Sequence, residues 1–165
     1  MGPAHTPPLG SGSHRGLKVE NASVRQYRHA RAAYGRGDYL IATVLMRSLA
    51  ERRNVLAQAY IGAVYAEGLG VPQDYSEAVK WLRGAAEQGY PQAQHGLAMM
   101  YQNGLGTPQD YVLSHMWFNL AAARYPVSAK RERDEAVKNR DLLAARVTTG
   151  QIADAQTLAR EWKPK

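Results

Sequence analysis

The sequence has no cysteine, a single phenylalanine and no long apolar run. Without cysteine the chain can form neither disulfides nor thiolate metal sites, and it is compatible with either redox environment. No stretch approaches the roughly 18 consecutive apolar residues of a membrane-spanning helix. The first residues also lack the basic start and the apolar core of a secretory signal. These absences leave a cytoplasmic location as the default expectation.

The net charge of +7 is distributed unevenly along the chain. Residues 1–57 carry a net charge of +6, residues 58–125 carry −2, and residues 126–165 carry +3. A nucleic-acid-binding protein is expected to concentrate basic residues on its working surface. Here the most regular part of the sequence carries the fewest, which argues against a nucleic-acid partner.

The N-terminal residues offer little that could be buried. Nine of residues 1–16 are Gly, Pro or Ser, a composition that does not support a packed core. We therefore expect a disordered tail over residues 1–19. The remaining residues, 20–165, are of a length that suits one domain.

An internal repeat dominates the rest of the chain. Residues 68–75 read GLGVPQDY, and residues 104–111 read GLGTPQDY, at an offset of 36. The same offset pairs Trp81 with Trp117. A fixed period of this length indicates stacked supersecondary units, each of which is unable to bury its apolar face alone. The residues expected to hold the repeat together are Gly62, Tyr65, Gly68, Gly70, Asp74, Ala78, Trp81, Ala85, Ala86, Gly89, Tyr101, Gly104, Gly106, Asp110, Trp117, Ala121 and Ala122.

Each unit is predicted to be helix, loop, helix. Apolar spacing over residues 57–67 indicates one helical stripe, and Gly68 suits the left-handed position after a helix. Asp74 is a candidate N-cap of the next helix, and Asp74 with Glu77 resembles a capping box. Gly89 then ends the second helix, and Pro91 suits the first position of the following one.

The repeat divides the domain into three helix pairs and a cap. The predicted units are residues 22–56, 57–92 and 93–126, of which the first is degenerate and has a shorter loop. The cap is expected over 127–163. It would contain a helix over 127–147 and a last helix that begins at a capping box formed by Thr148 and Gln151.

These features resemble the Sel-one-like repeat family, a relative of the tetratricopeptide repeat. The resemblance covers about residues 30–165 and includes the C-terminal segments 116–123 and 152–162, which look like the usual ending of bacterial members. It implies an all-α fold, a right-handed α-α solenoid with a C-terminal capping helix. It also implies an adaptor or scaffold that binds another protein. Bacterial members with this ending often begin with a secretory signal, which makes the periplasm the alternative location.

Candidate partner-binding residues are those that the repeat does not need. The residues on the first helix of each pair that point away from the predicted core differ between units, while the packing residues match. Solenoid curvature places successive first helices side by side and creates a concave face. We therefore expect a protein or peptide to bind there, with affinity in the region of 1 µM. The residues predicted to contact it are Arg31, Tyr60, Glu67, His95, Met99 and Asn103.

No catalytic constellation is recognisable. His95 and His115 could come near each other, but two histidines do not define a metal site without a third ligand. Asp74 and Asp110 stand where N-caps are needed, and this accounts for them better than catalysis does. We therefore expect no enzymatic activity, small-molecule substrate, cofactor or metal.

One alternative of a different class stays open at this point. The basic N-terminal helices could bind nucleic acid or another anionic surface through four arginines with interleaved aromatic rings. Such binding would weaken steeply as salt is raised. The residues concerned are Arg25, Arg28, Arg31, Arg36, Tyr27 and Tyr34.

Overall fold

The computed structural model describes residues 20–165, and the tail predicted over residues 1–19 lies outside this range. The described residues form eight α-helices and one short 3-10 helix, with no strand. The elements are α1 (Ala22–Gly35), α2 (Tyr39–Glu51), α3 (Val55–Glu67), α4 (Tyr75–Glu87), α5 (Pro91–Asn103), α6 (Tyr111–Arg124), η1 (Val127–Ala129), α7 (Lys130–Ala144) and α8 (Thr149–Glu161).

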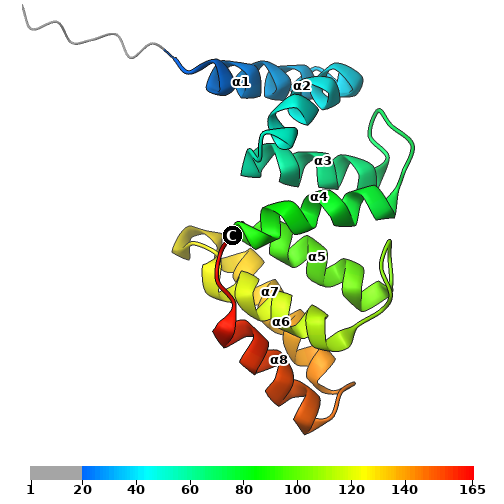
Figure 1. Ribbon diagram of the computed structural model, residues 1–165, viewed down its shortest axis with the longest axis vertical. Helices are drawn as coiled ribbons and strands as arrows, with labels where there is room; N and C mark the ends of the chain where they lie inside the picture. Colours follow the sequence, from blue (N-terminus) through cyan, green and yellow to red (C-terminus); the bar gives the residue numbers. More distant parts are fainter. Residues whose placement is uncertain (1–19) are drawn as a thin grey trace, which may run out of the picture.

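The helices stack as a solenoid, as the sequence predicts (Figure 1). Helices α1 and α2, α3 and α4, and α5 and α6 form three pairs, and each pair packs on the next. The C-terminal cap differs from a fourth pair, because α7 and α8 each pack mainly on α6. The single helix predicted over 127–147 is wrong at both ends, since a 3-10 turn occupies Val127–Ala129 and α7 ends at Ala144.

The helix ends follow local sequence chemistry. Gly68 and Gly104 end α3 and α5 in the left-handed conformation, where a side chain would be disfavoured. The side chain of Asp74 accepts a hydrogen bond from the backbone N–H of Glu77 at 3.0 Å, and Asp110 caps α6 in the same way. The predicted capping box at Thr148 is also present.

The second half of the capping box predicted at Asp74 is wrong. The Glu77 carboxylate accepts a hydrogen bond from the indole N–H of Trp81, at 3.2 Å, one turn further along α4. The indole N–H would otherwise be poorly satisfied in a largely buried side chain, and it competes successfully for the carboxylate. Asp74 alone therefore caps α4.

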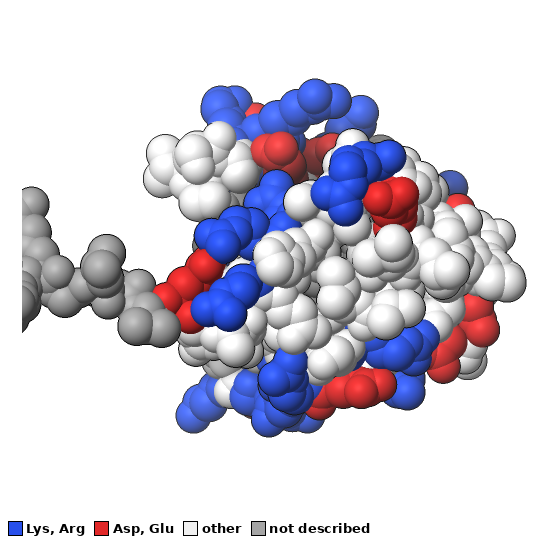
Figure 2. Space-filling view, turned by 90° about the horizontal axis from the view of Figure 1, so that it is seen from above, with Lys and Arg blue, Asp and Glu red and all other residues white. Residues whose placement is uncertain are grey.

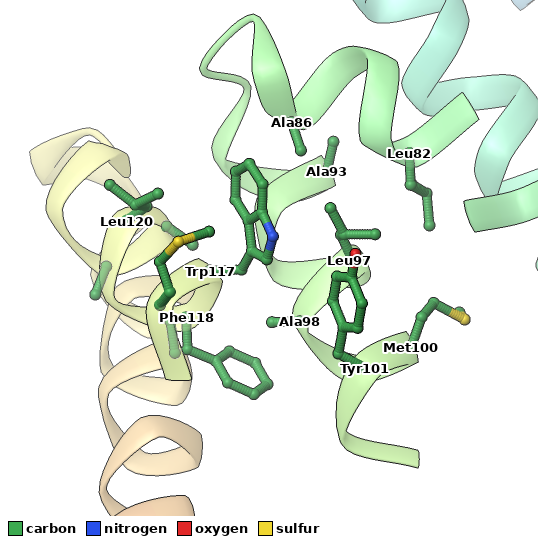
Figure 3. Packing of buried hydrophobic residues seen from close by; sticks show 14 of the residues in the cluster. Leu82, Ala86, Ala93, Leu97, Ala98, Met100, Tyr101, Trp117, Phe118 and Leu120 are labelled. Atoms are coloured by element: carbon green, nitrogen blue, oxygen red, sulfur yellow. The ribbon is translucent and has the colours of Figure 1, made fainter. Parts of the chain in front are cut away.

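Large and small side chains alternate in the core, and they do so at the repeat offset. Trp81 packs in one cluster with Ala50 and Ala57. Trp117 packs in the next cluster with Ala86 and Ala93, which are the corresponding alanines one unit later (Figure 3). Small residues let the helices approach closely, and the indole rings fill the space between them.

Buried hydrogen bonds repeat at the same offset. The side-chain amide of Gln58 donates to the carbonyl oxygen of Ala50 at 3.3 Å, and that of Gln94 donates to Ala86 at 3.2 Å. Each bond joins the first helix of one pair to the last turn of the pair before it. The identity of these glutamines in the two units therefore has a structural cause, because both side chains are buried and an amide N–H left there without a partner would be costly.

Candidate binding groove

A cavity lies between α1 and α3, on the first helices of two adjacent pairs. Its volume is about 410 Å³. Two aromatic rings from α1 and one from α3 contribute to its wall, together with one basic and one acidic side chain. The lining residues are Tyr27, Arg31, Tyr34, Gly35, Tyr60, Ala63, Val64, Glu67 and Leu69.

Two of the three tyrosines of this cavity, Tyr34 and Tyr60, pack against each other. The ring of Tyr34 meets that of Tyr60 edge to face, with centroids 5.5 Å apart, and meets Tyr39 of α2 at 5.1 Å. Burial and the neighbouring Tyr34 raise the pKa of Tyr60 to about 12. Tyr60 is therefore a neutral, fixed part of the wall throughout the physiological pH range.

Two further hollows continue the cavity along the first helices. One, along α1, has a volume of about 520 Å³ and shares Tyr27 and Arg31 with the cavity. The other, of about 240 Å³, lies between α3 and α5 and shares Ala63 and Glu67 with it. The three hollows are thus contiguous across α1, α3 and α5. We refer to them together as the groove.

Three of the six predicted partner-binding residues line the groove. Arg31, Tyr60 and Glu67 do so, and Glu67 belongs to two of its hollows. Met99 and Asn103 are exposed on α5 but do not line any of the three hollows. The side-chain amide of Asn103 donates to the carbonyl of Met99, at 3.1 Å.

His95 lies away from the groove. Its ring meets Phe118 and Tyr125 edge to face, with centroids 5.3 Å and 6.2 Å apart, and its Nδ1 is shielded from solvent. Burial lowers the pKa of His95, and the carboxylate of Glu135 on α7 opposes this in part. The side chain therefore belongs to the packing between α5, α6 and the cap.

Several residues that build the cavity are not among the predicted partner-binding residues. The sequence pattern places Tyr27 and Tyr34 only in the alternative basic face of the N-terminal helices, and Leu69 only in the repeated loop. The signal available was the degeneracy of the first unit. Its shorter loop ends α1 with Tyr34 and Gly35, and both line the cavity.

The arginine face considered for anionic ligands is partly neutralised. Arg28 pairs with Glu20 at 2.6 Å, and Arg36 pairs with Asp38 at 3.1 Å. The ring of Tyr34 is engaged with other tyrosines, as described above. Two of the four arginines thus already have an acidic partner, and this aromatic ring has limited freedom to stack on a base.

Within residues 20–165, no three His, Asp or Glu side chains gather so that they could hold a metal ion. In the same part of the chain, no helix combines the length and the apolarity needed to cross a membrane. Asp74 and Asp110, the carboxylates that might have been catalytic, are occupied as N-caps of α4 and α6.

Comparison with known proteins identifies the repeat. The Sel1 repeat matches residues 55–90 and 91–125. A Sel1 repeat protein from Oxalobacter formigenes is 33% identical, with a TM-score of 0.59, over 69% of this chain and 89% of that one. No curated protein is significantly similar to this chain.

A second solved structure shares more of the fold. A protective antigen present in uropathogenic Escherichia coli strains, which displays an SLR fold, is 27% identical with a TM-score of 0.74. The match covers 85% of this chain but only 29% of the antigen. Proteins built from this repeat are typically scaffolds for protein–protein interaction. With two matched repeats, the stacked helix pairs and these relatives, the chain belongs to the Sel1 repeat family.

Proposed function

We propose that this protein is a non-catalytic adaptor that binds a protein or peptide segment in the groove along α1, α3 and α5. The observation that carries the proposal is the cavity between α1 and α3, about 410 Å³ in volume, walled by Tyr27, Tyr34 and Tyr60. Ligand pockets are typically concave and largely apolar, with a few polar groups that fix orientation. This cavity is concave, and its wall combines aromatic and aliphatic side chains with the charged groups of Arg31 and Glu67.

The lining suggests which partner side chains would fit. Three tyrosine rings favour a large apolar or aromatic side chain in the cavity. Arg31 would pair with an acidic group of the partner, and Glu67 would accept a hydrogen bond from a backbone N–H or a basic side chain. Met99 and Asn103 would extend the contact along α5. The short groove would give a small interface and a dissociation constant in the region of 1 µM.

The experiment is affinity capture from the native source with a variant that fills the groove. Ala63 is exposed, lies on α3 and lines two of the hollows. Ala63→Arg places a long side chain there at little cost to the helix, because Arg is a good helix former. We expect the Ala63→Arg variant not to capture the partner. Ala153→Arg, on the exposed surface of α8, is the matched control and should retain it.

The variant pair Tyr60→Ala with Met99→Ala should also weaken binding. Tyr60 packs against the core cluster, so this pair is interpreted only together with a measured melting temperature. Charge reversal at Arg25 and Arg36, which belong to the same basic face but do not line the groove, should have little effect. If that reversal abolishes binding, and binding falls steeply with salt, the partner is a nucleic acid and the adaptor proposal is overturned.

A further inference from the structure

Helix α2 exposes a strip of large apolar residues at the N-terminal end of the stack. Leu40 is 62% exposed, Ile41 54% and Val44 62%. The three positions follow i, i+1, i+4 spacing and therefore lie on one side of the helix. We call them the α2 strip. They do not line the groove.

The second helix of the next pair, α4, is polar at these positions. Helices α2 and α4 begin exactly one repeat apart, at Tyr39 and Tyr75, so their residues correspond one to one. In α4 the equivalents of the α2 strip are Ser76, Glu77 and Lys80. These are residues that tolerate water. The repeat itself therefore does not require apolar side chains here.

Helix α6 has apolar residues at the same positions, and there they are less exposed. The equivalents are Val112, Leu113 and Met116, of which the first two are half-buried and Met116 is only 6% exposed. They lie on the helix against which α7 and α8 pack, and Leu113 and Met116 belong to a cluster that includes Leu143 of α7. An apolar strip at this position thus accompanies a helix laid upon it. The α2 strip is apolar, as α6 is at these positions, but within residues 20–165 it has no helix packed on it, as α4 has none there.

The charge around the α2 strip indicates what would cover it. Residues 20–54 contain seven arginines and three acidic residues, a net charge of +4. Figure 2 looks onto this end of the molecule and shows a broad area without charged side chains, bordered by Lys and Arg and, in places, by Asp and Glu. Contiguous apolar surface with a polar rim marks an interaction site. A partner with acidic flanks would complement this rim.

Two other occupants carry the wrong charge. A second copy that docked end to end would bring either the same arginine-rich end or the C-terminal region 126–165, whose net charge is +3. Residues 1–19 of the same chain contain Arg15 and Lys18 and no Asp or Glu. Each would add positive charge to a positive rim, which opposes association.

We propose that the α2 strip is a second docking surface, which binds an acidic amphipathic helix of a partner protein in the way that the C-terminal cap covers α6. Helix-in-groove and helix-on-helix recognition uses one apolar face of the bound helix, and here its flanking carboxylates would meet the arginines of α1 and α2. This surface is separate from the groove, so the two proposals succeed or fail independently.

The test uses the full-length chain and two synthetic peptides of about 18 residues, or five helical turns. Both carry the same Leu and Ala face. One has Glu on its flanks and the other has Lys. We expect the Glu peptide to bind at least about tenfold more tightly than the Lys peptide, and its affinity to fall as salt is raised. Equal binding of the two peptides, or binding of neither, would overturn the proposal.

The matched variant is Leu40→Ser with Ile41→Glu and Val44→Lys, which gives α2 the residues that α4 carries at the same positions. It should reduce the affinity for the Glu peptide at least about tenfold while the helical content and the melting temperature stay close to wild type. Ala63→Arg, which fills the groove, should leave peptide binding unchanged. Loss of peptide binding with Ala63→Arg would show that the peptide binds in the groove instead. A concentration-dependent dimer that the triple variant abolishes would show that the α2 strip binds a second copy. Either result would overturn the proposal.

Discussion

A Cβ atom at Gly106 would lie 2.1 Å from the carbonyl oxygen of Tyr75. The loop that follows α5 thus passes directly against the first residue of α4, one unit earlier in the chain. Gly70 makes the corresponding approach to Tyr39, where a Cβ atom would lie 2.8 Å from the Tyr39 Cβ. Both glycines also have positive φ angles. The repeated loops are therefore contact points between neighbouring units as well as connections within one unit.

Gly106→Ala should destabilise the protein strongly. The left-handed conformation costs about 1–2 kcal/mol for a residue with a Cβ, and the clash with backbone atoms adds about 1–3 kcal/mol. We expect the free energy of unfolding, measured with urea, to fall by about 2–5 kcal/mol. Gly150→Ala is the control, because only the Thr148 hydroxyl lies within 4 Å of its added Cβ. That variant should be neutral or stabilising, and similar losses in both would contradict the explanation.

Asp74→Ala and Asp110→Ala should each cost about 1 kcal/mol, because each removes an N-cap hydrogen bond at 3.0 Å. Asn at either position keeps an accepting side chain and should recover most of the loss. Thermal or urea unfolding measures both effects. Partner binding should survive all four substitutions. If binding disappears while the melting temperature is unchanged, the aspartates are site residues and their assignment as caps fails.

The middle of the fold could be predicted from the sequence because it repeats. Asp74, Asp110 and Pro91 locate helix starts, and Gly68 and Gly104 locate helix ends, through backbone chemistry that acts within a few residues. The structure confirms each of these positions.

The cap and the groove were harder to predict from the sequence, because they depend on contacts between residues that are distant in the chain. Nothing in the charge pattern of α7 indicates that it and α8 would both pack on α6. His95 occupies an outward position by helical periodicity, yet Phe118 and Tyr125 cover it. The cavity arises where Tyr34, at the end of a degenerate unit, meets Tyr60. Aligning the repeats does not reveal such a contact, because the other units have no equivalent residue pair.

Stability should fall as the pH is lowered below about 6.5. Burial lowers the pKa of His95 and His115 from the ordinary value of 6.5, and Arg140 reinforces the effect at His115. The unfolded chain then binds protons more readily than the native protein does. The free energy of unfolding is therefore highest above pH 6.5 and decreases as the pH falls through this value. Urea unfolding at several pH values between about 5 and 8 measures the slope.

The double variant His95→Leu with His115→Leu should flatten this pH dependence, whatever its effect on stability at pH 8. His29→Gln, at an exposed position on α1, is the control and should keep the wild-type slope. An unchanged slope in the double variant would show that other groups govern the acid sensitivity.

Trp162 should be the residue that holds α8 in place. Its ring meets Trp117 of α6 edge to face at 6.1 Å, and the guanidinium of Arg124 lies 4.6 Å from its ring centroid. Burying an aromatic ring is worth about 3–5 kcal/mol when burial is complete, and Trp162 is half-buried. We expect Trp162→Ala to lower the free energy of unfolding by about 2–3 kcal/mol. Trp162→Phe keeps an aromatic face for both contacts and should lose less than half as much.

The location of the effect distinguishes this role from a general loss of stability. Because a solenoid couples mainly neighbouring units, amide hydrogen exchange in Trp162→Ala should accelerate in α8 and on the side of α6 that α8 covers. Exchange in α1, α2 and α3 should remain as in the wild type. Uniform acceleration along the whole chain would mean that α8 does not open as a local unit, and that Trp162 stabilises the stack as a whole rather than the attachment of its last helix.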